Sequence, residues 1–361
     1  MRSALIIAAV AGMAAANPIV ARDTSAQDGI DFDVLDAAPE PTKVGPAVGV
    51  ASETATYNVA SASAAAAADA TQNPVSPPDS TLAARDNPSP NNSGCTKTEP
   101  IGAGYTSTPD TYDAFMANTT YDNIANTPPQ IDGYDRVFVA LSRAIESPSY
   151  LSYTTLKSYD PFLCQQACDT ASLCYSFNLY IERDPYFSPN YTNCQNPKST
   201  VNYKCALFGA QVSDQAATNL GQWRADFHVG IKGSNGYNKV AAPAPISGFS
   251  APVELGGAIN APGNYMGAKW YTGPYNPGQC ASACTATTAY NSRHPRSDGK
   301  YDTCSFFNAY VLSLNGAPQG TYCSMYTTTW GKQYSTNYGQ YRGSDRYTVS
   351  QSYGFSLAPA S

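Results

Sequence analysis

Charged residues are scarce in this 361-residue chain, where they make up 13% of the sequence, against about 25% in an ordinary soluble domain. A basic surface is lacking as well, because the formal net charge is −6. Nucleic acids and anionic membranes attract proteins through basic surfaces that displace counterions. The composition therefore argues against both of these partners.

Long hydrophobic runs are missing after the N-terminus. Residues 4–14 form an apolar run behind Arg2, and small residues follow at 14–16. This is the pattern of a secretory signal peptide, so residues 1–16 are predicted to be a cleaved signal. Beyond them, no stretch has the ~18 to 20 uninterrupted apolar residues that a membrane span requires. We therefore expect a secreted chain with no membrane insertion.

Cysteine and tryptophan are absent from residues 17–92, which hold only two aromatic residues. Ten acidic and three basic residues give this stretch a net charge of −7, whereas residues 93–361 have seventeen residues of each sign. A segment so acidic and so rich in Ala, Ser and Pro has too little apolar surface to fold alone, so we expect it to be disordered. The tripeptide Ala-Arg-Asp occurs at 21–23 and at 84–86, which leaves open that the segment is a propeptide.

An internal repeat organises the rest of the chain. Four blocks recur in the same order: YDPFLCQQAC at 159–168 and YNPGQCASAC at 275–284, CYSFNLY at 174–180 and CSFFNAY at 304–310, Cys205 and Cys323, and TNLGQWR at 218–224 and TNYGQYR at 336–342. Such self-similarity predicts two homologous domains. We place them at residues 95–239 and 248–358, joined by an Ala/Pro-rich linker at 240–247.

Each repeat predicts one short helix on an antiparallel sheet, an α+β fold. Pro161 and Pro277 stand just before a Cys-x-x-x-Cys pair, in segments typical of a helix that begins after proline, at 162–171 and 278–287. Alternating segments rich in aromatic and β-branched residues predict the strands, at 176–181, 203–208, 222–229 and 305–312. The matched Asn178 and Asn308 are expected to be buried and to hydrogen-bond a loop backbone.

The ten cysteines indicate disulfides, because an even number in a secreted chain favours pairing. Closing a loop of about 40 residues stabilises the fold by on the order of 4 kcal/mol in the chain-entropy model. A zinc site at Cys-x-x-x-Cys would need two further ligands at matching spacing. We therefore expect neither a metal nor any other cofactor.

A helix bearing Cys-x-x-x-Cys, with two further cysteines on neighbouring strands, resembles the PAN/apple domain. The chain is also similar to a group of secreted fungal proteins, some of them named for fruit-body expression. In the PAN/apple family the first cysteine pairs with the fourth and the second with the third. The resemblance thus implies the pairs Cys164–Cys205, Cys168–Cys174, Cys280–Cys323 and Cys284–Cys304, which would leave Cys95 and Cys194 to pair with each other. It implies a tandem of two disulfide-stapled PAN/apple-like domains.

Catalytic patterns are weak. The two histidines, His228 and His294, occupy non-equivalent positions in the repeats, and no Gly-x-Ser-x-Gly stands beside them. Glu182 and Asp184 have the residue types of a glycosidase pair, but the second repeat has Leu in place of the glutamate. We expect an exposed ion pair with Arg183 instead and predict no enzyme, with a hydrolase kept as a minor alternative.

Exposed aromatic residues are expected, because all but one of the 27 tyrosines lie in residues 93–361, more than two small cores can bury. Aromatic faces beside amides and arginines suit saccharides, whose C–H faces stack on rings. The candidate ligand-binding residues are Trp223, Arg224, Trp270, Tyr271, Tyr275, Tyr341 and Arg342. Because neighbours on a strand face opposite ways, Trp223 itself is expected to point into the core. The insertion at 285–303, which carries His294, is expected to be a solvated loop.

The sequence thus predicts a secreted, non-catalytic protein that binds extracellular carbohydrate or protein, such as a polysaccharide or glycoprotein, at a cell wall. Three Asn-x-Ser/Thr sites predict a glycoprotein, at Asn91, Asn118 and Asn190. The alternative is a structural, self-associating extracellular protein whose tyrosines pack between chains.

Overall fold

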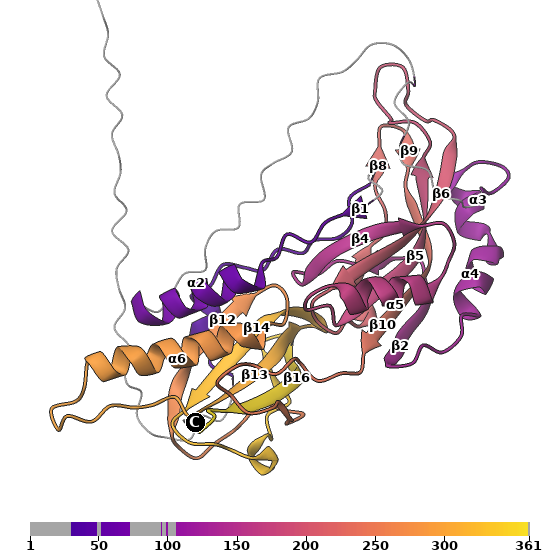
Figure 1. Ribbon diagram of the computed structural model, residues 1–361. Coiled ribbons are helices and arrows are strands. Elements are labelled where there is room, and N and C mark those ends of the chain that lie inside the picture. Colours follow the sequence, from indigo (N-terminus) through magenta and orange to yellow (C-terminus); the bar gives the residue numbers. More distant parts are fainter. Residues whose placement is uncertain (1–29, 49–51, 73–94, 96–98, 100–105, 360–361) are drawn as a thin grey trace, which may run out of the picture.

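The computed structural model describes residues 30–48, 52–72, 95, 99 and 106–359 (Figure 1). Two large antiparallel sheets with helices packed on them make up most of this part of the chain, so the predicted α+β class is confirmed. The predicted signal peptide at 1–16 lies outside the described residues.

The first sheet has the strand order β1-β4-β6-β5-β10-β2. Its strands are β1 (Ser52–Glu53), β4 (Tyr150–Leu156), β6 (Ser199–Phe208), β5 (Ser176–Pro185), β10 (Gly230–Lys239) and β2 (Tyr134–Leu141). Helix α5 (Pro161–Thr170) packs on β5 and β6 and begins one residue before the predicted start. The side chain of Asp160 accepts hydrogen bonds from the first free N–H groups and so caps the helix there. Helices α3 (Tyr112–Ala117) and α4 (Thr119–Asn126) pack on β10.

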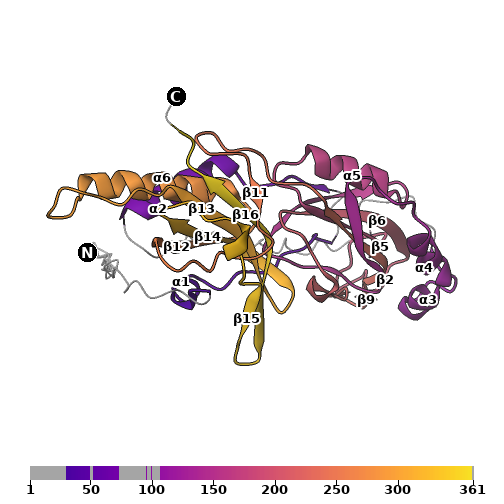
Figure 2. The same cartoon turned by 90° about the horizontal axis from the view of Figure 1, so that it is seen from below.

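The second sheet has the order β11-β16-β13-β14-β12, with β15 paired to β16. Its strands are β11 (Val253–Glu254), β16 (Asp345–Ser356), β13 (Phe306–Leu314), β14 (Ala317–Tyr326), β12 (Tyr265–Thr272) and β15 (Gly339–Arg342). Figure 2 shows the hairpin of β15 and β16 projecting away from the sheet. Short elements complete the described fold: β3 (Ala144–Ile145), β7 (Ala217–Asn219), β8 (Trp223–Arg224), β9 (Phe227–His228), η1 (Asp214–Ala216) and η2 (Lys332–Tyr334).

Helix α6 (Pro277–Arg293) packs on the second sheet and is longer than the sequence predicts. It continues past residue 287 into the insertion at 285–303, which is therefore helical at its start. The physical reason is that no Gly or Pro interrupts the chain between Gly278 and Pro295.

Five disulfides join all ten cysteines, and they are the pairs that the PAN/apple resemblance implies. Cys164–Cys205 fastens α5 to β6, and Cys280–Cys323 fastens α6 to β14. This disulfide content is typical of extracellular proteins.

Asn178 and Asn308 are fully buried, as expected, and make matching hydrogen bonds in the two sheets. The Oδ1 atom of Asn178 accepts from the N–H of Ile145 at 2.9 Å, and that of Asn308 accepts from the N–H of Ile259 at 2.9 Å. The expectation that the amide holds a loop backbone is confirmed for Asn308, whereas Asn178 holds the short strand β3.

The acidic front of the chain differs from the disordered segment that the sequence predicts. Within it, α1 (Phe32–Asp36) packs against β12, β1 pairs with β4, and α2 (Val59–Gln72) lies along α6 (Figures 1 and 2). The segment has no core of its own. Ile30 and Ala66 are buried against the rest of the chain, and Phe32 and Tyr57 are partly buried against it. Whether it is a propeptide stays a prediction.

The parts of the chain that carry the two sheets share a hydrophobic cluster. The rings of Tyr175 and Tyr275 meet edge to face at 5.5 Å, and the N–H of Tyr275 donates to the carbonyl of Gly209 at 2.6 Å. Gly209 allows this close approach, since a Cβ atom there would lie 2.4 Å from the side chain of Pro274.

Candidate functional site

The seven candidate ligand-binding residues do not form one surface. Trp270, Tyr271 and Tyr275 are buried, so a ligand cannot stack on them. Tyr341 on β15 is 69% exposed, and no ring in the described residues stacks on it. The neighbouring guanidinium of Arg342 is paired with the carboxylate of Asp36 at 2.6 Å.

Trp223 is exposed, so the expectation that it lies in the core is wrong. It keeps 65% of its surface in solvent. Strands β8 and β9 form a small hairpin apart from the two large sheets, in which Trp223 pairs with His228 and Arg224 with Phe227. The single strand predicted at 222–229 is therefore two short strands with a turn between them, and their buried face is the one that carries Phe227.

Three aromatic rings stack at this hairpin. The ring centroids of Trp223 and His228 are 4.2 Å apart with an interplanar angle of 13°, and those of Tyr112 and His228 are 3.7 Å apart at 16°. Two nearly parallel rings at these distances must lie on opposite faces of the imidazole. Trp223 is therefore the outermost ring of the stack, which we call the aromatic platform (Tyr112, His228 and Trp223).

Arg183 supports the platform from beneath. Its guanidinium lies 4.2 Å from the centroid of the Phe227 ring, and its Nη1 donates to the carbonyl of His228 at 2.9 Å. Its Nη2 donates to the carboxylate of Asp110 at 2.9 Å. Burial would raise the pKa of Asp110, but hydrogen bonds from Ser199 and Arg183 outweigh it and hold the pKa below its ordinary value. Partial burial and the Arg183 charge lower the pKa of His228, which favours the neutral form of its ring.

The hairpin and the loop bonded to it also carry Arg224 and an exposed tyrosine. The guanidinium of Arg224 pairs with Glu99 at 2.7 Å. Tyr191, which is 78% exposed, lies on a loop held by the Cys95–Cys194 disulfide. This loop joins the hairpin, because the N–H of Asp226 donates to the carbonyl of Gln195 at 3.0 Å.

Glu182 and Asp184 are buried on the first sheet, so the expected exposed ion pair with Arg183 is wrong. Both carboxylates contact the ammonium of the buried Lys204. Burial and the charge of Asp184 raise the pKa of Glu182 to about 8, against the opposing effect of Lys204. With side chains no more than 2% exposed, neither carboxylate is open to a substrate in this state.

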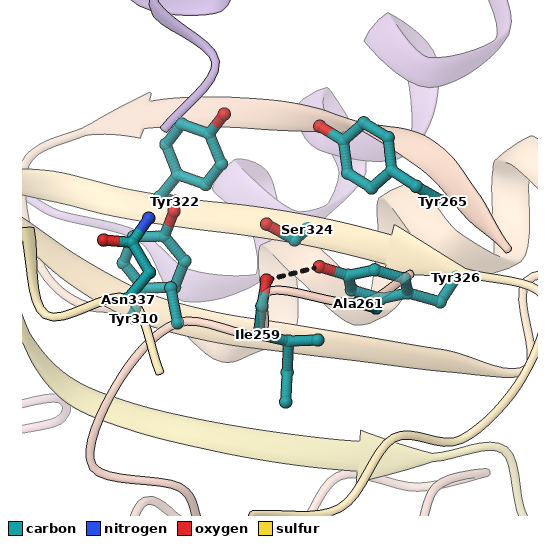
Figure 3. Close-up of a pocket in the computed structure, with 9 residues that line it drawn as sticks. Ile259, Ala261, Tyr265, Tyr310, Tyr322, Ser324, Tyr326 and Asn337 are labelled. Carbon is teal, nitrogen blue, oxygen red and sulfur yellow. Dashed lines mark hydrogen bonds between the residues drawn. The ribbon is translucent and has the colours of Figure 1, made fainter. Parts of the chain in front are cut away.

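A cavity on the second sheet is lined by tyrosines (Figure 3). The hydroxyl of Tyr326 donates to the carbonyl of Ile259 at 3.1 Å at its edge. The cavity measures about 20 Å³, which is room for one water molecule and far too little for a sugar ring.

The second histidine forms no constellation with other catalytic side chains. His294 follows α6, its Nδ1 lies 3.0 Å from the carbonyl of Tyr290, and its ring stacks on that tyrosine. The nearby Arg296 and Asp302 form an exposed ion pair. In the described part of the chain, no group of three or more His, Cys, Asp or Glu side chains could hold a metal ion. None of the helices described is long and apolar enough to cross a membrane.

The glycosylation sites stay predictions. Asn91 lies outside the described residues. The side-chain nitrogen of Asn118 donates to Ser107 at 3.1 Å, whereas Asn190 lies on the same loop as Tyr191, where its Oδ1 accepts from the N–H of Thr192.

Comparisons with protein-family models, curated proteins and solved structures find no match to this chain. The site therefore has to be interpreted from its own geometry. Tyr112 and the role of His228 were not predictable from the sequence, since Tyr112 lies more than 100 positions from both other rings of the platform.

Proposed function

We propose that this chain is a secreted tandem of two PAN/apple-like units that binds extracellular polysaccharide at the aromatic platform. One observation carries the proposal: Trp223 is 65% exposed and is held flat against His228. The C–H face of a pyranose ring stacks on such a surface. The indole face away from His228 is the face that the sugar would cover.

Rigidity supports a binding role. An exposed tryptophan that moves freely would lose side-chain entropy when a ligand orders it. Trp223 is already ordered by a stack that continues through His228 to Tyr112. A sugar would therefore bind without that entropic cost. The exposed Tyr191 lies on the loop that is bonded to the hairpin, and its hydroxyl suits the hydroxyl groups of a saccharide. Arg224 lies on the opposite face of its strand from Trp223 and is paired with Glu99.

The PAN/apple assignment is supported by the sequence repeat and by the first-to-fourth and second-to-third cysteine pairing in each repeat. Secretion is supported by the disulfide content and the signal-like N-terminus. A cell wall is where a secreted protein meets insoluble polysaccharide, so we place the protein there. We assign no catalytic role, because Glu182 and Asp184 are buried.

The test is retention of the full mature chain on insoluble chitin, β-glucan and cellulose. We expect retention on at least one polymer and an affinity at least about tenfold lower for Trp223→Ala, the effect of losing a central aromatic contact. Tyr341→Ala is the matched control: it is equally exposed but belongs to no ring stack among the described residues, and it should be retained like the unaltered chain. Equal retention of both variants would contradict the assigned site, and no retention on any polymer would favour a protein ligand or self-association instead.

A further inference from the structure

Residues 30–48 and 52–72, which we call the front segment, lie across both large sheets (Figures 1 and 2). They contact the rest of the molecule in three places: at the edge of the first sheet, on the outer face of the second sheet, and along α6. Each contact uses a different kind of recognition.

At the first sheet the segment adds a strand. β1 pairs antiparallel with β4, with Ser52 opposite Thr154 and Glu53 opposite Tyr153. Upstream, the N–H and carbonyl of Val44 exchange hydrogen bonds with Ser147 at 3.3 and 2.9 Å. Without β1, strand β4 would be the free edge of this sheet. Strand addition of this kind is how a sheet edge binds an extended peptide.

Side chains of the first sheet fix the register of that strand. The carbonyl of Ala47 accepts hydrogen bonds from the hydroxyl of Tyr153 at 2.9 Å and from the ammonium of Lys204 at 3.3 Å. The hydroxyl of Tyr150 donates to the carboxylate of Glu53 at 2.8 Å. The buried Lys204 is thus both the partner of Glu182 and an anchor for the segment.

On the second sheet, α1 covers aromatic residues. Phe32 packs edge to face on Tyr347 with centroids 4.8 Å apart. The N–H of Asp31 donates to the hydroxyl of the buried Tyr322 at 3.1 Å. Arg342 holds both oxygens of Asp36, at 2.6 and 2.7 Å.

Along α6 the contact is made by α2. Ala66 is fully buried between the helices. The ammonium of Lys269 pairs with Asp69 at 2.9 Å, and the side-chain nitrogen of Asn276 donates to the hydroxyl of Tyr57 at 3.0 Å. Each end of the segment therefore has its own ion pair.

The front segment is held on the rest of the chain by noncovalent contacts, including ion pairs, and not by disulfides. Residues 30–72 hold six acidic residues and one lysine, whereas residues 93–361 are neutral, and the segment's acids meet Arg342 and Lys269. The segment contains no cysteine, so no disulfide ties it down. Its only downstream covalent connection to the rest of the chain is the 22 residues at 73–94.

We propose that this composite surface is a docking site for the front segment of a second copy of the chain, which makes between two molecules the contacts that it makes here within one. The occupant is identified by its fit, because a second copy supplies the same strand, helices and acidic residues. A surface vacated by its own segment exposes a sheet edge and apolar side chains, which favours a replacement. The chain would then assemble through exchanged front segments.

Shortening the connection tests the proposal directly. Deletion of residues 73–90 leaves four residues, which reach at most about 18 Å. The connection must run from the end of α2 to Cys95, which is bonded to the loop beside the β8–β9 hairpin. α2 and this hairpin lie far apart in the molecule (Figure 1), so the shortened connection cannot join them. We expect light scattering to give at least twice the mass of one chain. Lengthening the same connection by 18 Gly/Ser residues is the control and should leave the mass unchanged. A folded monomer from the shortened chain would overturn the proposal.

A second experiment does not depend on the folding of a deletion variant. A protease site placed within residues 73–94 of the full chain allows the connection to be cut after folding. A fluorescent polypeptide of residues 30–72 should then replace the resident segment, with a saturable rise in anisotropy. Tyr153→Phe removes one donor to Ala47 and should weaken binding about fivefold, whereas Tyr191→Phe should not. Absence of exchange, or equal binding of a polypeptide of scrambled sequence, would overturn the proposal.

Discussion

A tryptophan with 65% of its surface in water loses much of the stabilisation that burial would give it. Trp223 is nevertheless ordered, because His228 lies against one face and Tyr112 continues the stack. The alternation of its strand is visible in the sequence, but which face is buried is not, since that depends on Arg183 and Phe227 meeting beneath the hairpin. Trp223 could therefore be predicted from the sequence as a candidate binding residue, but its exposure could not.

At the same scale, Glu182 predicts how stability depends on pH. Its pKa is about 8 in the folded chain, above the ordinary value of 4.5. Between pH 4.5 and pH 8 the folded state holds a proton on Glu182 that the unfolded state releases. The contribution of Glu182 to the free energy of unfolding is therefore fully present below pH 4.5 and is lost as the pH rises through 8. Urea unfolding with the disulfides intact should give a lower free energy of unfolding at pH 8 than at pH 5.

The variant Glu182→Gln should flatten this pH dependence, because the amide does not titrate. Glu254→Gln, which changes an exposed carboxylate on β11, is the matched control and should keep the slope of the unaltered chain. The assignment to Glu182 fails if both variants keep the same slope.

At the scale of elements, the helices and strands near the cysteines were largely predictable from the sequence. α5 begins at Pro161 and α6 at Pro277, where proline fits the first helical turn. The predicted end of α6 at residue 287 is wrong, because the repeat comparison placed an insertion there without showing that it begins as a helix. The order of the strands was not predicted either, since it depends on pairings between segments far apart in the chain.

The buried amide of Asn308 ties β13 to the loop that carries Ile259. Asn308→Ala would leave the N–H of Ile259 without its acceptor and remove the donor to the hydroxyl of Ser352. We expect a loss of about 2 to 3 kcal/mol in the free energy of unfolding, the cost of leaving buried polar groups unpaired. Asn291→Ala, on the exposed end of α6, should cost less than about 0.5 kcal/mol. Equal losses of unfolding free energy in the two variants would contradict the claim that the buried position of the Asn308 amide causes the larger loss.

At the scale of the whole molecule, the largest departure from the sequence prediction is the front segment. Composition alone predicts that it cannot fold, and the structure gives it no core of its own. Phe32 and Ala66 are instead packed against the rest of the chain. A prediction based on the segment's own composition cannot detect this, because the apolar surface that it needs belongs to β12, β14 and α6.

The arrangement of the molecule also separates the candidate residues that the sequence had grouped. Trp270 is buried against the second sheet, and Tyr275 is buried where the parts of the chain that carry the two sheets meet. Trp223 lies on a hairpin of the first half. The repeat comparison identified aromatic and arginine residues that suit a saccharide, but it could not show which of them are exposed. Exposure depends on packing between segments that are far apart in the chain. The proposed binding site lies on the β8–β9 hairpin and on α3, which carries Tyr112.

The most direct measurement of the proposed binding role is an NMR titration of the full chain with a soluble oligosaccharide cut from the polymer that retains it. The three indole N–H signals report on Trp223, Trp270 and Trp330, and Trp223→Phe assigns the first. We predict that the Trp223 signal shifts saturably while the signal of the buried Trp270 stays in place. A saturable shift of the Trp270 or Trp330 signal with Trp223 unmoved would contradict the aromatic platform as the sugar-binding site.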